Sequence, residues 1–242
     1  MTRTAARSAA APFLLASALA FTAPAAADLD RIGTLSQAEF ELLAENLGAA
    51  THFRPIAPAE PLGVLGADVA LETSYARIDP EPFERAGAEL ELDALLVPRL
   101  HAQKGLPLNL DVGALLAAAP ELGATLVGAE LRLALVEGGV AVPAVSVRAS
   151  YSRLQGVAAL DADHWALELA VSKGLLMVTP YAGVGAVRTD AGAPETSSLD
   201  DVSVTQRKVF AGLNLNLGVN VGAEIERTGE YTSYSAKVGI RF

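Results

Sequence analysis

The chain has no cysteine among its 242 residues, which excludes a disulfide scaffold, a thiolate metal site, a cysteine nucleophile and the acylated N-terminal cysteine of a lipoprotein. It has only 3 histidines, and 18 Lys and Arg stand against 28 Asp and Glu, giving a formal net charge of -10. An acidic chain of this kind is not expected to bind nucleic acid. Beyond the N-terminal segment, no apolar run reaches the roughly 20 residues that a membrane-spanning helix needs.

The first 27 residues have the pattern of a secretory signal peptide. Arg3 and Arg7 give a positive start, an apolar run covers Ala9 to Phe21, and Ala25 to Ala27 offer small residues for cleavage before Asp28. An N-terminal membrane anchor is the alternative, but the run is short for a spanning helix. The sequence therefore predicts a bacterial protein exported by the general secretory route. The remaining length suits one domain.

Residues 28–62 contain a predicted short helix followed by a connector. Ser36 and Glu39 have the spacing of a capping box, and apolar residues follow at helical intervals before Gly48. Three prolines make residues 51–62 extended. The helix either caps the periplasmic mouth of the following domain or plugs its interior. Capping is favoured here, because a narrow interior filled by charged side chains leaves little space.

From Gly63 onward apolar and polar residues alternate, which is typical of strands with one apolar face. The last run is the clearest, with apolar residues at every second position from Thr232 to Phe242. Comparable runs start near residues 67, 95, 108, 129, 145, 164, 176, 211 and 219. The predicted fold is all-β: a transmembrane, antiparallel, up-and-down β-barrel of about ten strands over residues 63–242, preceded by the short helix.

The predicted connections differ in length. Tight joins fall near residues 105, 138, 174 and 218, whereas residues 78–90, 155–163 and 189–203 form long ones. Tight joins at one end and long loops at the other are typical of outer-membrane barrels, and an even strand number places both termini at the tight-turn end. Short joins near Pro120 and Gly229 weaken this asymmetry.

Alternation alone does not separate a membrane barrel from a soluble periplasmic ligand-binding barrel, whose apolar face points inward. Four aromatic residues favour the membrane barrel, because they share the apolar face and fall toward the long-loop end: Tyr75, Tyr151, Trp165 and Tyr234. Aromatic residues gather in this way at the boundary between lipid and water.

The terminal strand, residues 231–242, ends in an aromatic residue and resembles the assembly signal of bacterial outer-membrane barrels, carried by Tyr234, Val238, Ile240 and Phe242. The stretch from Pro180 to Gly185 is similar to a strand of small outer-membrane β-barrel proteins. The resemblance implies a Gram-negative outer-membrane location, porin-like architecture, and lipid, lipopolysaccharide and the barrel-assembly machinery as partners. Lys237 replaces a glycine often found in the signal.

The polar faces of the predicted strands would line the lumen with charges of both signs. These are Asp68, Glu72, Arg99, Asp111, Glu130, Arg132, Arg148, Glu168, Lys208, Glu224, Glu226, Lys237 and Arg241. Charges in a low-dielectric wall must be paired or hydrated. Two interpretations stay open: a salt-bridged structural barrel that is closed, or a narrow passive channel for small solutes.

One weak pattern of residues suggests catalysis. His164 can be drawn with Ser150 or Ser152 and Glu168 as an outer-membrane hydrolase acting on lipid or peptide. The G-x-S-x-G elbow is absent, so no catalytic residue is predicted. The histidines have no metal-ligand spacing, and the acidic residues of the loop from Asp190 to Asp201 are expected to be solvated. Neither metal nor cofactor is predicted.

Overall fold

The structure, a computed structural model, describes residues 29–88, 93–157, 160–193 and 197–242. The predicted signal peptide, residues 1–27, lies outside these ranges. Among the described residues no helix is both long enough and apolar enough to cross a membrane.

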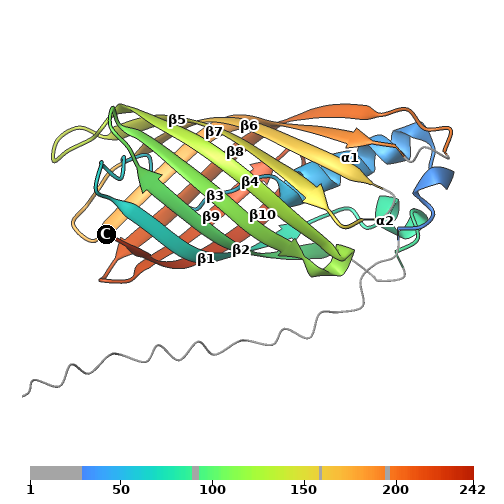
Figure 1. Cartoon of the computed structure of the whole chain (residues 1–242), viewed down its shortest axis with the longest axis horizontal. Coiled ribbons are helices and arrows are strands. Elements are labelled where there is room, and N and C mark those ends of the chain that lie inside the picture. The colour runs from blue at the N-terminus through green and yellow to red at the C-terminus, as the bar shows by residue number, and fades with distance from the viewer. Residues whose placement is uncertain (1–28, 89–92, 158–159, 194–196) are drawn as a thin grey trace, which may run out of the picture.

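Ten antiparallel strands close into one barrel (Figure 1). They are β1 (Ala67–Arg77), β2 (Ala94–Gly105), β3 (Leu110–Ala119), β4 (Ala124–Val136), β5 (Ala144–Gln155), β6 (Asp161–Ser172), β7 (Val178–Gly192), β8 (Val202–Asn216), β9 (Asn220–Thr228) and β10 (Tyr231–Arg241). Each strand pairs with its sequence neighbours, and β1 pairs with β10. The predicted fold class and strand number are confirmed.

The closure between β1 and β10 brings both ends of the barrel sequence to the same mouth. Tyr75 lies opposite Tyr234 and Glu72 opposite Lys237. The Ala67 N–H donates to the Phe242 carbonyl at 2.6 Å, and the Phe242 N–H donates back at 3.0 Å. We call this mouth, with the joins 106–109, 137–143, 173–177 and 217–219, the tight-turn end. The opposite mouth, which carries the loop 78–93, is the long-loop end.

Some element boundaries differ from those predicted. Leu108 and Asn109 were expected to begin a strand, but both have positive φ angles, 65° and 58°, and lie in the turn before β3. The loop predicted over residues 189–203 shrinks to 193–201 because β7 and β8 continue further. The start of β8 was missed because Val202 points inward there, so the apolar face is inverted relative to the rest of that strand.

Four helical segments accompany the strands: η1 (Ile32–Thr34), α1 (Gln37–Thr51), α2 (Glu81–Arg85) and η2 (Pro120–Leu122). The predicted capping box is present at the start of α1. The Ser36 backbone N–H donates to the Glu39 carboxylate at 2.7 Å, and the Glu39 N–H donates to Ser36 Oγ at 3.4 Å. The helix continues past Gly48, where it was expected to end, to Thr51.

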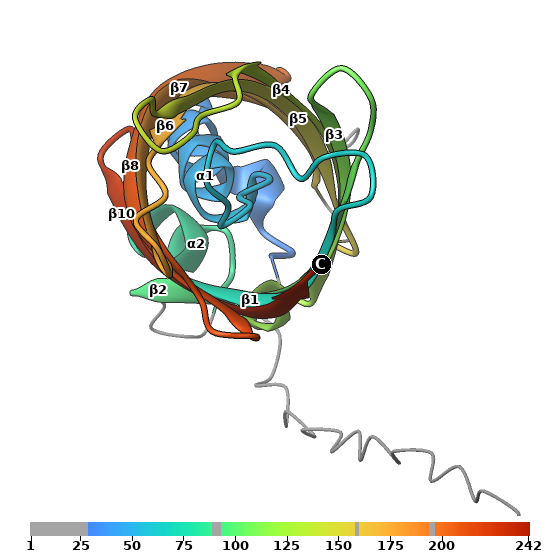
Figure 2. The ribbon, with the colours of Figure 1, turned by 90° about the vertical axis from the view of Figure 1, so that its left-hand side faces the viewer.

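Helix α1 lies inside the barrel, within the ring of strands in Figure 2. It begins at the long-loop end and packs mainly against β8 and β7, and residues 52–66 then lead through the interior to β1 at the tight-turn end. The favoured position as a cap across the tight-turn mouth is therefore wrong. Gly48 lies against Thr189 and Gln206, so the absence of a side chain lets the helix approach the wall closely.

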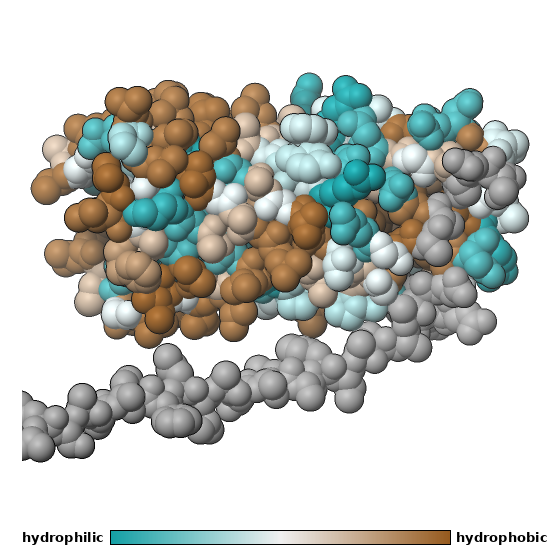
Figure 3. Space-filling model, viewed as in Figure 1, coloured by the Kyte–Doolittle hydropathy of each residue, from teal (hydrophilic) through white to brown (hydrophobic). Residues whose placement is uncertain are grey.

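The polarity of the wall reverses along the barrel axis. In the long-loop half many inward residues are apolar, including Leu95, Val97, Leu126, Leu154 and Val202, and outward positions carry Arg77, Arg153, Arg188, Ser203 and Thr205. In the other half charges point inward and large apolar side chains point outward. Figure 3 shows apolar side chains dominating the wall nearer the tight-turn end and polar ones gathering toward the other end. The long-loop half is therefore built like a soluble barrel, and the tight-turn half like a membrane barrel.

Candidate functional site: the charged lumen and the segment that fills it

The charges predicted to line the lumen all point inward. Twelve of the thirteen are buried, and Arg241 at the end of β10 is partly buried. Seven are acidic and six are basic. Buried charges are costly without partners, so their neighbours decide whether this lumen is a pore or a packed interior.

The lumen is occupied by the chain's own N-terminal part, residues 29–62, which we call the lumen segment. Its connector contributes Arg54, which is fully buried and supplies the seventh basic side chain. Arg54 Nη2 lies 2.7 Å from Glu226 Oε1 and donates to the Ala49 carbonyl at 2.6 Å. The lumen segment therefore balances the charge of the wall as well as filling its space.

From Arg54 a continuous set of ion pairs runs around the inside of the wall. Lys208 Nζ lies 2.8 Å from Glu226 Oε2 and 2.6 Å from Glu168 Oε1. Glu168 Oε2 lies 3.0 Å from Arg148, which in turn lies 3.0 Å from the next carboxylate, Glu130. Each of these carboxylates contacts at least two donors.

The set ends at His101, whose two ring nitrogens lie 3.2 Å from Glu130 Oε1 and 3.2 Å from Glu72 Oε1. The Ile56 backbone N–H of the connector donates to Glu72 at 3.4 Å. We call these residues the ion-pair belt: Arg54, Glu226, Lys208, Glu168, Arg148, Glu130, His101 and Glu72. The belt begins at Arg54 of the lumen segment, and its last carboxylate, Glu72, accepts the Ile56 N–H of the same segment, so that segment is part of the network.

Glycines in the wall make room for the belt. Gly185 of β7 lies between Glu168 of β6 and Lys208 of β8 in the strand register. Because Gly185 has no side chain, Lys208 and Glu168 reach each other across β7. A Cβ atom at Gly185 would come within 2.5 Å of the Leu167 carbonyl oxygen and 3.1 Å of Glu168 Cγ. Gly113 of β3 plays the same part beside Glu130.

Nearer the tight-turn end, wall side chains bind the backbone of the connector. Arg132 pairs with Asp111 at 2.7 Å and donates to the Pro58 carbonyl at 2.6 Å. Asp111 accepts the Leu62 N–H at 3.1 Å. Close by, Asp68 pairs with Lys237 at 3.0 Å. An extended connector has no internal hydrogen bonds, so these contacts satisfy polar groups that would otherwise be buried without partners.

The connector makes one further contact of this kind, in which the Ala59 N–H donates to Ser172 Oγ at 3.1 Å. Within the wall, Arg241 pairs with Asp68 at 2.9 Å. At the tight-turn mouth, beside the end of the connector, lies a hollow of about 600 Å³. It is lined by Glu60, Leu62, Asn109, Glu137 and Leu176.

The long-loop half of the lumen is filled by apolar packing. Phe40, Leu43 and Leu47 of α1 are fully buried in one cluster with inward residues of β2, β4 and β5. Phe83 of α2 belongs to the same cluster, so α2 packs against the interior at the long-loop end. The apolar side chains of helix α1 therefore pack against the apolar part of the inner wall.

The residues of the weak hydrolase pattern do not form a triad. His164 Nε2 lies 2.9 Å from Thr51 Oγ1 and His164 Nδ1 lies 3.0 Å from Thr189 Oγ1. Neither Ser150 Oγ nor Ser152 Oγ has a hydrogen-bond partner among the described residues. His164 thus joins the end of α1 to β7. Within the described ranges no group of three His, Cys, Asp or Glu side chains is arranged to hold a metal ion, and Glu195 of the acidic loop lies outside those ranges.

The four predicted interface aromatics lie on the outward face. Tyr75, Trp165 and Tyr234 are about half exposed, and Tyr151 less so. Tyr75 pairs with Tyr234 across β1 and β10, and Tyr151 pairs with Trp165 across β5 and β6. All four lie nearer the long-loop end of their strands, at the level where the wall changes polarity.

Sequence reasoning missed the contribution of the lumen segment to the charged site. Arg54 and His52 lie outside the alternating strands, so no periodic pattern marked them as inward. One signal was present in the sequence. The residues predicted to line the lumen include one more acidic than basic side chain, and Arg54 of the proline-containing connector could supply the missing positive charge.

No protein-family model matches the chain, and no curated protein sequence matches it. Among solved structures, it is similar to the N-terminal β-barrel domain of Pseudomonas aeruginosa OprF, at 14% identity over 72% of this chain and 97% of that one, with a TM-score of 0.39. The KdgM porin in complex with disordered oligogalacturonate is 8% identical over 72% and 99%, with a TM-score of 0.39. The Acinetobacter baumannii outer membrane protein Omp33 is 10% identical over 74% and 100%, with a TM-score of 0.34.

The broad resemblance to small outer-membrane barrels is confirmed at the level of fold by this chain's own closed ten-strand pairing.

Proposed function

We propose that this protein is a non-catalytic integral protein of the bacterial outer membrane, a structural barrel that its own lumen segment seals. The observation that carries the proposal is the inverted burial of the tight-turn half. There, charged side chains such as Arg132 and Lys237 are at most 1% exposed, while Leu71, Leu167 and Ile240 on the outer wall are 58–68% exposed. In water this distribution would be unfavourable on both faces, and in a bilayer it is favourable on both.

The level at which the four interface aromatic residues lie gives the orientation of the barrel in the membrane. The tight-turn half below Tyr75 and Trp165 lies in the membrane, with Phe242 toward the periplasm, and the polar-walled half projects from the outer surface. The lumen segment then runs from the outer rim, through the barrel, to the periplasmic end. Lipid and lipopolysaccharide surround the wall, and the terminal strand is the element offered to the barrel-assembly machinery.

Sealing favours a structural role over a passive channel for small solutes. A conducting lumen needs hydrated charges that bind ions weakly, whereas the belt pairs Glu168 and Glu226 with cationic side chains at 2.6–3.0 Å. Above the belt, Leu43 and Phe40 pack against the wall with no exposed surface. The tight-turn half of the interior is therefore closed by ion pairs, and the long-loop half by apolar packing.

A matched pair of substitutions tests the membrane position. Leu169→Lys places a charge on the outward face of the tight-turn half, and we expect it to lower the free energy of unfolding in lipid by about 2–4 kcal/mol. Thr205→Lys adds the same charge outward in the long-loop half, where we expect a change below about 1 kcal/mol. Both are measured by urea unfolding in vesicles, read by the heat-modifiable shift of the folded barrel on a gel. Equal effects, or release of the wild-type chain as a soluble periplasmic protein, contradict the proposal.

A further inference from the structure

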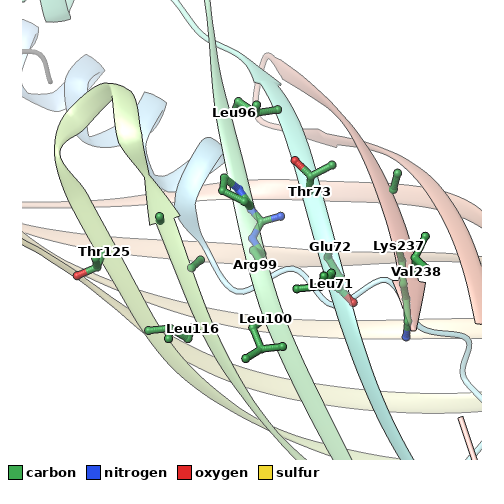
Figure 4. A pocket seen from close by; sticks show the side chains of 14 residues that line it. Leu71, Glu72, Thr73, Leu96, Arg99, Leu100, Leu116, Thr125, Lys237 and Val238 are labelled. Carbon is green, nitrogen blue, oxygen red and sulfur yellow. The ribbon is translucent and has the colours of Figure 1, made fainter. Parts of the chain in front are cut away.

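The outer wall of the tight-turn half carries an apolar groove that crosses several strands. The groove has a volume of about 800 Å³ and lies over β10, β1, β2, β3 and the start of β4 (Figure 4). Its floor is a row of small or compact outward residues, Ala236, Thr73, Pro98 and Ala118. Thr73 lies opposite Ala236 on one side and opposite Pro98 on the other, so the row is continuous across the strands.

Larger side chains form the two sides of the groove. On the side toward the tight-turn end lie Val238, Leu71, Leu100 and Leu116, which are neighbours in the strand register. On the long-loop side Leu96 lines the groove, and Tyr75 and Tyr234 are its neighbours at the same level of the strand register. The groove is therefore a built depression between two rows of bulky residues, just on the membrane side of the aromatic level.

The groove includes the point where the ladder between β2 and β3 stops. The pairing of these strands ends at Arg99 and Ala117, although both strands continue toward the long-loop end. Pro98 has no N–H to donate to a neighbouring strand. The Leu96 N–H donates instead to the side chain of Glu121 at 3.2 Å. A local separation of the two strands thus opens the wall surface without leaving the Leu96 N–H unpaired.

The dimensions of the groove fit an acyl chain and exclude a helix. Five strands from β10 to β4 span about 19 Å at about 4.8 Å between neighbours, and one leaflet of hydrocarbon is about 15 Å deep. The two bulky rows stand four residues apart, which is about 13 Å between backbones before their own side chains are counted. A helix of about 10–12 Å diameter does not enter the space that remains.

A cationic side chain lies beyond the groove at the water boundary. Arg77 is outward, exposed and two residues past Tyr75 on β1, which is about 7 Å along the strand. Its strand partner is Ala94, so Leu96 of the groove is its diagonal neighbour. Among the described residues Arg77 has no ion pair. Arginine binds phosphate with two parallel hydrogen bonds.

We propose that this groove binds one acyl chain of an outer-leaflet lipopolysaccharide molecule, whose lipid A phosphate contacts Arg77. The site rests on the membrane orientation proposed above, because that orientation brings the groove into the outer leaflet. The small floor row supplies the depth, the bulky rows hold the chain, and Arg77 selects a phosphorylated headgroup at the level of the aromatic residues.

Native mass spectrometry of the full chain released from detergent micelles tests the site, with bis-phosphorylated lipid A as the probe and phosphatidylethanolamine as the comparison. We expect one retained lipid A per chain. Ala236→Phe fills the floor and should weaken retention about tenfold, which corresponds to about 1.4 kcal/mol. Thr73→Leu fills it with a smaller side chain and should also weaken retention. Arg77→Ala should reduce the preference for lipid A over phosphatidylethanolamine.

Ala149→Phe is the matched control, because Ala149 is an outward alanine between Leu131 and Leu167 on a wall that the groove does not reach. Unchanged retention in this control supports the site. Equal loss in Ala149→Phe and Ala236→Phe, equal retention of the two lipids by the wild type, or an unaltered preference in Arg77→Ala overturns it. Each variant is first checked for the heat-modifiable shift. A wild type that shows the shift but no lipid A preference refutes the groove and leaves the sealed barrel standing.

Discussion

Replacing Arg54 with methionine should destabilise the barrel through its interior, although Arg54 belongs to no strand. The substitution removes a fully buried cation that lies 2.7 Å from Glu226 and leaves the lumen one positive charge short. Breaking a buried ion pair from one side costs about 3–5 kcal/mol. Glu226 keeps Lys208 at 2.8 Å and His52 at 3.2 Å, so we expect the lower end, about 3 kcal/mol.

Urea unfolding in lipid vesicles, read by the heat-modifiable gel shift, measures this loss. Glu226→Gln in the Arg54→Met background removes the carboxylate that has lost Arg54 and should restore at least about 1 kcal/mol, so the two substitutions should be non-additive. Arg85→Ala is the control: Arg85 pairs with Glu81 and Glu39, but its side chain is 55% exposed, and such surface pairs contribute at most about 1 kcal/mol. An effect of Arg54→Met no larger than that of Arg85→Ala, or strict additivity with Glu226→Gln, would refute the reasoning.

Three further predictions follow from the wall and the helix. Gly185→Ala should lower the free energy of unfolding by about 1–3 kcal/mol because its Cβ meets the Leu167 carbonyl, whereas Gly139→Ala, which meets nothing within 4 Å, should have little effect in the same urea assay. The Ser36 N–H lowers the pKa of Glu39 below the usual glutamate value of 4.5. Hydrogen exchange should therefore show the first turn of α1 protected above that pH and losing protection as the pH falls through the folded-state pKa, and Ser36→Ala should lose about 1 kcal/mol of this protection. Trp165 is the only tryptophan, so its fluorescence should be quenched more by lipids brominated near the headgroup than by lipids brominated near the chain end; the reverse order would place the aromatic level wrongly.

The sequence predicted the barrel and its inward charges because both follow from a period of two. Glu130, Arg132 and Arg148 were placed in the lumen by their position between outward apolar residues, and the structure puts them there. The same rule failed for the start of β8, because the apolar residues there point inward. Where a strand crosses the level of the aromatic residues, its apolar side chains change from pointing outward to pointing inward. Alternation alone does not reveal where that change occurs.

The position of the lumen segment inside the barrel lay beyond sequence reasoning for a different reason. The position of α1 depends on how its apolar face matches the inner wall of the long-loop half, which is a property of the assembled barrel. Arg54 pairs with Glu226, which is more than a hundred positions away in the sequence. Gly185 makes room for a contact between side chains of its two neighbouring strands. The prolines of the connector indicated an extended chain, but nothing local indicated that the wall would supply its hydrogen bonds.

Single-channel recording of the purified full chain in a planar lipid bilayer tests the central claim most directly. A barrel sealed by the ion-pair belt and by α1 should insert without conductance steps at moderate voltage, and heat-modifiable protein recovered from the same preparation should confirm that it is folded. Stable open steps from the folded, unmodified chain would contradict the sealed barrel and favour a passive channel.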